Sequence, residues 1–180
     1  MDIQDIAWSL SRIPRFNGHT VSKIPYSVAQ HCIFVSEILE KQNHSNLIQL
    51  YGLLHDATEC YMTDIISPVK QISDIRSIIK KIEKQIEECI FDALNIKHMS
   101  DQDHITIKNA DLISQRIEGH AYMPSRGKYW VLPEVSIIDL QNFSDPLPAT
   151  EAYSLFMERY EKLMLRHIRL KSEQSTDYPI

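Results

Sequence analysis

Residues 53–59 read LLHDATE and place His55 and Asp56 side by side, directly after two leucines. An aspartate is almost never fully buried unless it is paired, so a polar doublet that follows an apolar run needs partners. Two kinds of partner are open at this point: a hydrogen-bonded network in the core, or a metal ion. The choice depends on which polar residues the other helices bring to the same place.

Length, composition and charge limit the class of protein. The 180 residues are 43% hydrophobic and 24% charged, which is typical of one globular domain that spans residues 1–180. The net charge of −5 argues against nucleic acid as the main partner, because a phosphate backbone favours a basic face. Cys32, Cys60 and Cys89 have no paired spacing, which predicts free thiols in a reducing cytoplasm.

We expect no membrane partner. No stretch approaches the run of about 20 apolar residues that spans a bilayer. The first residues, MDIQDIAWSL, lack the basic and then apolar order of a signal peptide. The sequence therefore predicts a cytoplasmic protein.

The hydrophobic pattern predicts an all-α fold. Glycine is rare, with four in the chain, and apolar residues recur at steps of three and four over long stretches. Asp74 precedes the clearest of these stripes and is expected to be its N-cap. The predicted helices cover residues 2–12, 26–42, 46–61, 74–96, 103–122 and 150–171.

Two stretches that proline and glycine punctuate are expected to be irregular. They cover residues 13–25 and 123–148. The second of them contains KYWVL, residues 128–132, which predicts a short strand or hairpin. Neither stretch is a repeat or of low complexity, so we expect them to connect the helices of one bundle.

The predicted helix over residues 46–61 carries a group of potential ligands. Asp56 and Glu59 are three residues apart, and His55 and Glu59 are four apart, spacings that place side chains on one helical face. Imidazole and carboxylate suit a divalent cation such as Mg²⁺, Mn²⁺, Co²⁺ or Zn²⁺. Two neighbouring ligands do not fix an ion, so other helices have to contribute.

His31 and Asp111 are the candidates for those further ligands. Each is a polar residue in an apolar helical pattern, His31 in SVAQHCIFV and Asp111 in IKNADLISQ. Either one alone is better read as a hydrogen-bonded residue of the core. The four residues together, on three successive helices, favour a metal site.

The order His31, His55–Asp56, Asp111 is the signature of the HD-domain metal-dependent phosphohydrolases, an all-α superfamily that this chain therefore resembles. Within that superfamily the chain resembles the YfbR-like 5′-deoxynucleotidases and is most similar to the viral dATP triphosphohydrolases called DatZ. The resemblance covers about residues 2–120. The stretches that carry it are DIAWSLSRIPRFNGHT (5–20), YSVAQHC (26–32), GLLHDATECYMTDIISPVK (52–70) and IKNAD (107–111).

The resemblance implies a role for each matching residue of the metal site. His31, His55, Asp56 and Asp111 correspond to the ligands of a divalent ion, whose identity (Zn, Co, Mn or Mg) stays open. Glu59 corresponds to the acid that orients or deprotonates a water, unless it is a solvated surface acid. The roles of the remaining matching positions concern a second acid and the substrate.

Asp64 corresponds to a second acid that positions water or the leaving group; the alternative is a helix N-cap. Arg15, Lys70 and Lys108 correspond to cations that face phosphates, and Lys108 shares a helical face with Asp111. Two further residues have weaker assignments, Phe16 to the base or to packing alone and His19 to a phosphate or a loop hydrogen bond. Asn17 stands where related sequences often carry glycine, which affects the shape of the base pocket.

The resemblance predicts a divalent-metal-dependent phosphohydrolase that acts on deoxynucleotides. Water attack on the α-phosphorus of dATP would release deoxyadenosine and triphosphate. The alternative substrate is a deoxynucleoside monophosphate, as for a 5′-deoxynucleotidase, and a third reading is a nucleotide-binding module without activity. The resemblance also implies a homo-oligomer, either a dimer or a hexamer, and the host cytoplasm if the chain is viral.

Overall fold

The computed structural model of the chain describes residues 1–70, 72–136 and 145–175. Over these residues it is a bundle of helices without strands, and one isolated antiparallel bridge joins Pro14 to Ser27. This confirms the all-α HD-domain class. The elements are α1 (Ile3–Leu10), the 3₁₀ turn η1 (Arg15–Gly18), α2 (Val28–Lys41), α3 (Asn46–Leu54), α4 (Glu59–Met62), α5 (Ser67–Lys70), α6 (Ser73–Ala93), α7 (Asp101–Tyr122) and α9 (Ala149–Ser175).

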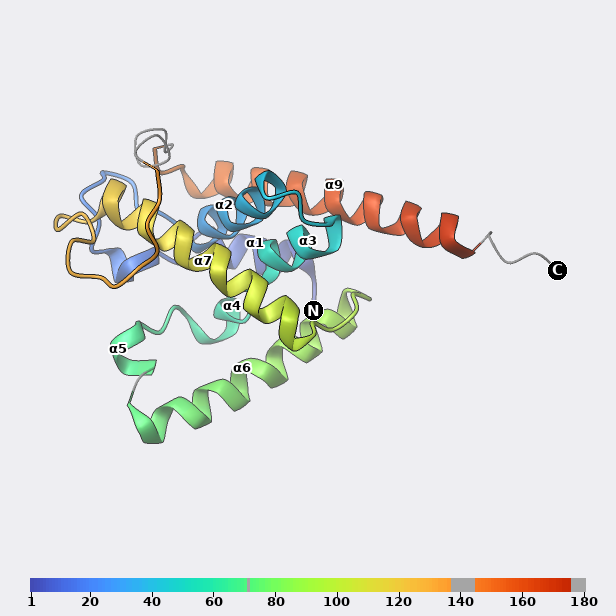
Figure 1. The fold of residues 1–180 in the computed structure, drawn as a ribbon, viewed down its shortest axis with the longest axis horizontal. Helices are drawn as coiled ribbons and strands as arrows, with labels where there is room; N and C mark the ends of the chain where they lie inside the picture. Colours follow the sequence, from blue (N-terminus) through green and yellow to red (C-terminus); the bar gives the residue numbers. More distant parts are fainter. Residues whose placement is uncertain (71, 137–144, 176–180) are drawn as a thin grey trace.

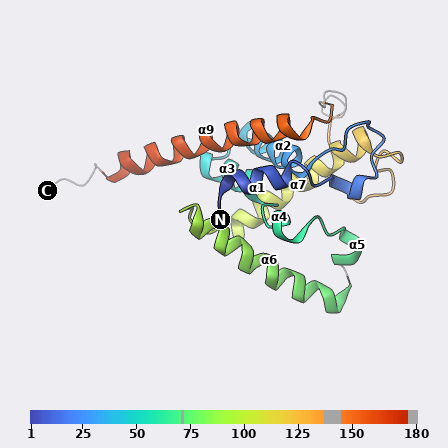
Figure 2. The ribbon, with the colours of Figure 1, turned by 180° about the vertical axis from the view of Figure 1, so that it is seen from behind.

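Helix α2 lies at the centre of the bundle and packs against α3, α7 and α9. In both views α9 runs along α1, α2 and α3, and α6 lies at the opposite edge of the molecule (Figure 1 and Figure 2). No helix among the described residues is both long and apolar enough to cross a membrane. The arrangement puts α2, α3 and α7, the three elements with the predicted ligands, side by side.

Local sequence explains where these helices begin. Ser27 caps α2 by accepting a hydrogen bond from the main-chain N–H of Gln30. The apolar face of α2 then packs into the core. Ser100 and Asp103 form a reciprocal capping box at the start of α7, each side chain bonding the other's main-chain N–H. The core residues of α2 are Val28, Ala29, Cys32, Val35, Ile38 and Leu39.

The single helix predicted over residues 46–61 is wrong, because α3 ends at Leu54 and a turn separates it from α4. The imidazole Nδ1 of His55 donates to the carbonyl of Gly52 at 2.8 Å, so a side chain uses an acceptor of the last helical turn. The next main-chain bonds span three residues, from Ala57 to Leu54 and from Glu59 to Asp56. The turn tightens the chain where the ligands lie.

Two further local predictions are wrong. Helix α6 begins at Ser73, so Asp74 lies in its first turn, where it accepts a hydrogen bond from the Ser73 hydroxyl instead of capping the helix. The stretch KYWVL forms turns and irregular chain, not a strand. The main-chain N–H groups of Lys128 and Trp130 donate to the carbonyls of Ser125 and Gly127 within turns, so these donors do not pair with a neighbouring strand.

Two leucines of α9 test whether this helix belongs to the core. Leu163 is fully buried, whereas Leu165, two residues further on, is 60% exposed. We expect Leu163→Ala to lower the free energy of unfolding by about 2–5 kcal/mol, through lost burial and the cavity that remains. Leu165→Ala is the matched control and should change it by less than about 0.5 kcal/mol. Urea unfolding measures both, and equal effects would contradict the packing of α9.

Candidate metal centre

The four predicted ligands converge on one point. His31 comes from α2, His55 and Asp56 from the turn after α3, and Asp111 from α7. The Nε2 atom of His31 lies 3.3 Å from Nε2 of His55, 3.4 Å from Oδ2 of Asp56 and 3.4 Å from Oδ1 of Asp111. Oδ2 of Asp56 is also 3.3 Å from Nε2 of His55. We call these four side chains the ligand cluster.

These separations fit a single divalent ion. Ligand distances of about 2.0–2.1 Å at angles of about 90–110° put neighbouring ligand atoms roughly 3.0–3.4 Å apart. The donor set of two imidazoles and two carboxylates suits Zn²⁺, Co²⁺ and Mn²⁺, and leaves coordination positions for water and substrate. The residues present therefore fit the metal that the sequence predicted, without selecting which one.

Each imidazole is oriented by a hydrogen bond at Nδ1, the ring nitrogen that points away from the ligand cluster. His55 donates from Nδ1 to the Gly52 carbonyl, and His31 donates from Nδ1 to Oε1 of Glu118 at 2.7 Å. A hydrogen bond at one ring nitrogen turns the other nitrogen toward the ion and fixes the tautomer. Each imidazole thus presents Nε2 to the ligand cluster.

The electrostatics of the cluster favour ionised carboxylates. Burial by itself would raise the pKa of Asp56 and of Asp111, but the neighbouring imidazoles and Arg15 lower both below the usual range. Burial lowers the pKa of His55, whereas for His31 the surrounding carboxylates outweigh burial and raise the pKa. A cation at this point would therefore replace a proton that the carboxylates hold on His31.

A second group of possible ligand atoms includes a cysteine. The sulfur of Cys32, one imidazole nitrogen of His55 and one carboxylate oxygen of Asp56 all lie within 4.8 Å of one another. Burial raises the pKa of this thiol well above its usual value, and a metal ligand would have to be the thiolate. Cys32 is therefore better described as a core residue next to the site.

Glu59 lies beside the ligand cluster in the first turn of α4. Its side chain is buried, and burial first, then Asp56 and Asp64, raise its pKa to about 9. Its Oε2 atom is buried without a hydrogen-bond partner among the described atoms, which fits a carboxylate that receives a water or a substrate. The interpretation of Glu59 as a solvated surface acid is excluded by this burial.

Asp64 and the two lysines lie further out. Asp64 is half-buried with a raised pKa, mainly from burial, and it does not cap α5, which begins three residues later. Lys108 donates to Oδ2 of Asp111 at 2.7 Å. Lys70 instead pairs with Glu83 of α6 at 2.9 Å, although Glu59 and Asp56 are near enough to help raise its pKa.

Arg15 is the buried cation of the site. Its guanidinium lies 3.5 Å from Asp56, 3.8 Å from Asp111 and 3.6 Å from Glu118. Arg15 is the first residue of η1. Its main-chain N–H donates to the carbonyl of Tyr26 at 2.8 Å, next to the bridge between Pro14 and Ser27. The structure thus brings the predicted phosphate-binding arginine to the ligand cluster.

Phe16, the predicted contact of the base, and Asn17 follow Arg15 in η1. Phe16 and Asn17 have φ values of +53° and +51°, and a bulky residue rarely adopts this left-handed conformation. The ring of Phe16 lies 5.6 Å from that of Trp130. His19 is exposed at the end of η1, and its predicted role stays a prediction.

Sequence reasoning missed Glu118 and Trp130. Glu118 is fully buried and contacts His31, Arg15 and Tyr26. Its position seven residues after Asp111 is two turns along the same face of α7, and this spacing could have revealed it. Trp130 packs over Gly119, where an added Cβ would lie 2.6 Å from the indole, and that contact has no sequence signal we recognise.

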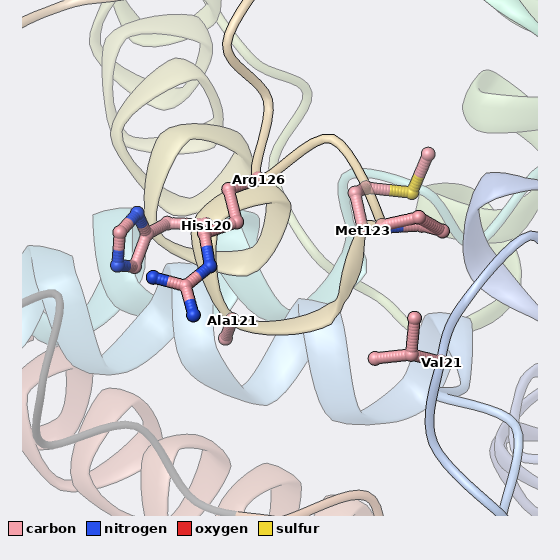
Figure 3. A pocket seen from close by; sticks show the side chains of 6 residues that line it. Val21, His120, Ala121, Met123 and Arg126 are labelled. Carbon is pink, nitrogen blue, oxygen red and sulfur yellow. The ribbon is translucent and has the colours of Figure 1, made fainter.

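A cavity of about 430 Å³ lies at the C-terminal end of α7. Val21 and Met123 lie on one side of it, and His120 and Arg126 on the other (Figure 3). None of the residues that line it belongs to the ligand cluster.

Comparison with known proteins gives one family and three relatives. The family model described as 5′-deoxynucleotidase YfbR-like matches residues 7–121, which include all four ligands. The uncharacterized protein YfdR of Escherichia coli strain K12 is 34% identical over 162 residues, covering 89% of this chain and 83% of its own.

The two other relatives are matched over shorter stretches. The 4′-phosphooxetanocin A phosphatase of Priestia megaterium is 34% identical over 127 residues, 65% of each chain. An uncharacterized protein of Rhodobacter capsulatus is 31% identical over 125 residues, covering 66% of this chain and 61% of its own. The match to these two proteins thus spans less than two thirds of their length.

The buried Glu59 predicts an unusual pH dependence of stability in the metal-free protein. Its pKa is about 9 in the folded chain and 4.5 by default, so above pH 4.5 the folded chain holds a proton that the unfolded chain releases. Stability therefore falls as the pH rises from about 4.5 toward 9. Glu59→Gln removes this titration, and we expect the variant to unfold at least about 2 °C above the wild type at pH 8.

Thermal unfolding followed by circular dichroism in the presence of a chelator measures this difference. At pH 4 the two proteins should unfold at similar temperatures, because Glu59 is protonated in both states there. Glu158→Gln, at an exposed position of α9, is the matched control. A lower unfolding temperature for Glu59→Gln at pH 8 would show that the buried carboxylate is stabilised and ionised.

Proposed function

The chain belongs to the YfbR-like 5′-deoxynucleotidase family and is a metal-dependent phosphohydrolase, and we propose that it hydrolyses the 5′ phosphate ester of deoxynucleotides. The observation that carries this proposal is that Nε2 of His31 lies 3.3–3.4 Å from a ligand atom of each of His55, Asp56 and Asp111, with the buried carboxylate of Glu59 beside them. Such a set suits hydrolysis, because it joins a Lewis-acid position to a general base.

His31, His55, Asp56 and Asp111 would hold the ion, which supplies Lewis acidity and makes a neighbouring water more acidic. The raised pKa keeps Glu59 protonated in the metal-free protein, so Glu59 has to ionise on binding of the ion before it takes a proton from the water that attacks the α-phosphorus. The bond between phosphorus and the 5′ oxygen breaks, and that oxygen leaves with a proton as the nucleoside hydroxyl. Arg15 contacts a phosphate oxygen through its planar guanidinium. Asp64 would orient water or the leaving group.

The substrate that this charge distribution fits best is a deoxynucleoside monophosphate. The two lysines that would track a longer phosphate chain already pair with carboxylates, Lys70 with Glu83 and Lys108 with Asp111. A phosphate monoester carries a charge of about −2 at neutral pH, which a divalent ion and Arg15 can match without breaking those pairs. The ring of Phe16, whose centroid lies 5.3 Å from Cζ of Arg15, would contact the base.

A second candidate function is that of a dATP triphosphohydrolase, in line with the resemblance to the viral DatZ enzymes. The observation that favours it is the presence of three cations around one ligand cluster, Arg15, Lys70 and Lys108. A triphosphate would need Lys70 to leave Glu83 and bind the outer phosphates. The reaction at the α-phosphorus would be the same, with triphosphate as the second product.

Turnover should depend on Glu59 as a base. Glu59→Gln keeps the shape of the side chain and removes its basicity, so we expect kcat to fall by about 10²–10⁴-fold while the ion stays bound. Steady-state kinetics on deoxynucleoside monophosphates, with metal content measured on the same samples, tests this. The control is Glu158→Gln, which should retain wild-type kcat. A loss below about tenfold would remove Glu59 from the proton-transfer step.

Product analysis with Lys70→Ala separates the two substrates. We expect dAMP to be the better substrate, giving deoxyadenosine and phosphate, and we expect Lys70→Ala to change dAMP turnover by less than about threefold, because one ion pair at this exposure contributes little. The control is Lys84→Ala, an exposed lysine of α6. If dATP is the better substrate, yields intact triphosphate and is selectively impaired by Lys70→Ala, the second candidate is correct.

A further inference from the structure

Glu118 joins two parts of the site that come from different segments of the chain. We propose that Glu118 is a positioning residue, which fixes the tautomer and orientation of His31 for the metal and anchors Arg15 next to it. The inference rests on the proposed function and deepens it, since it assigns the residue that couples metal binding to phosphate binding. It concerns a fully buried carboxylate of α7 that does not face the ion itself.

The contact with His31 is the shorter of the two. Oε1 of Glu118 accepts a hydrogen bond from Nδ1 of His31 at 2.7 Å, within a region where both side chains have no exposed surface. Because Nδ1 keeps its proton in this bond, Nε2 is the nitrogen that gives up its proton when an ion binds, and its lone pair then points toward His55, Asp56 and Asp111. A carboxylate behind a metal-binding imidazole also makes the imidazole a stronger donor to the ion.

The contact with Arg15 uses the other oxygen. Oε2 of Glu118 lies 3.6 Å from a terminal nitrogen of Arg15 and has no hydrogen-bond partner among the described atoms. Nε of Arg15 is likewise buried without a partner. The arginine is therefore held by charge more than by hydrogen bonds, which leaves its donors available to a phosphate. Removing the charge of Glu118 would weaken the attraction that holds the guanidinium here and leave it to Asp56 and Asp111 alone.

Tyr26 provides a contact that separates these roles from simple packing. Its hydroxyl donates to Oε1 of Glu118 at 2.9 Å, and Tyr26 lies two residues before the start of α2. Tyr26→Phe removes this donor and leaves the contacts to His31 and Arg15 in place. A residue that acts only by filling the core would respond to both substitutions alike, whereas a positioning residue responds mainly to the loss of its own charge.

The test begins with the binding of Mn²⁺ to the metal-free protein, measured by isothermal titration calorimetry. Glu118→Gln keeps the volume and removes the charge, and we expect it to weaken Mn²⁺ binding by about 10–100-fold. Tyr26→Phe should stay within about threefold of the wild type. Ser36→Ala breaks two buried hydrogen bonds, to the carbonyl of Gln49 and from Nε of Arg159, and neither involves the ligand cluster. It controls for lost stability and should also stay within threefold.

Nitrogen NMR of the ¹⁵N-histidine-labelled, Zn²⁺-loaded wild type tests the tautomer without any substitution. We expect His31 to carry its proton on Nδ1 and to bind Zn²⁺ through Nε2. A proton on Nε2, or metal binding through Nδ1, would overturn the proposal even if Glu118→Gln fails to fold. Activity provides a further measurement, since loss of the Arg15 anchor should raise KM for dAMP in addition to any change in kcat.

The failure of this inference can be told apart from that of the proposed function. Wild-type protein that binds Mn²⁺ and hydrolyses dAMP, together with Glu118→Gln that binds Mn²⁺ within threefold of it, overturns the role of Glu118 alone. Wild-type protein that binds no Mn²⁺ overturns both. Weakened binding in Glu118→Gln with Tyr26→Phe unchanged supports the coupling of the two contacts.

Discussion

The fold depends on how it neutralises the carboxylates buried between α2, α3 and α7. Asp56, Asp111 and Glu118 lie within 4 Å of the same guanidinium, that of Arg15, and each of them also contacts His31. Ionised carboxylates are costly to remove from water unless cations and hydrogen bonds compensate them. A divalent ion among the four ligands would complete this compensation. The carboxylates that destabilise the metal-free fold would then be the groups that bind the ion.

Helix α7 contributes to the site at three levels. Asp111 belongs to the ligand cluster. Glu118, two turns later, accepts a hydrogen bond from Nδ1 of His31, the ring nitrogen that points away from the cluster. Gly119 has no side chain, which allows Trp130 to pack against the helix and to reach the ring of Phe16. The left-handed backbone of Phe16 is thus supported by contacts beyond η1, as expected for strain at a binding site. Helix α7 therefore positions both Asp111 of the ligand cluster and the contact between the rings of Phe16 and Trp130.

The helices and the ligands could be predicted from the sequence because their signal is periodic. Polar residues at buried positions of apolar helices, such as His31 and Asp111, stand out against the stripe that surrounds them. The break of the helix at His55 could not be predicted, because it depends on an imidazole that bonds a main-chain carbonyl of its own helix. Glu118 was missed for a related reason, since a glutamate on a helix is usually exposed, and its partners come from α2 and η1.

The central claim is that one divalent ion occupies the ligand cluster, and anomalous diffraction from crystals grown with Mn²⁺ tests it most directly. The account predicts one strong anomalous peak, about 2.0–2.3 Å from Nε2 of His31, Nε2 of His55 and one oxygen each of Asp56 and Asp111. In crystals of Asp111→Asn the peak should be weaker or absent. A fully occupied peak elsewhere, with none among these four side chains, would contradict the account.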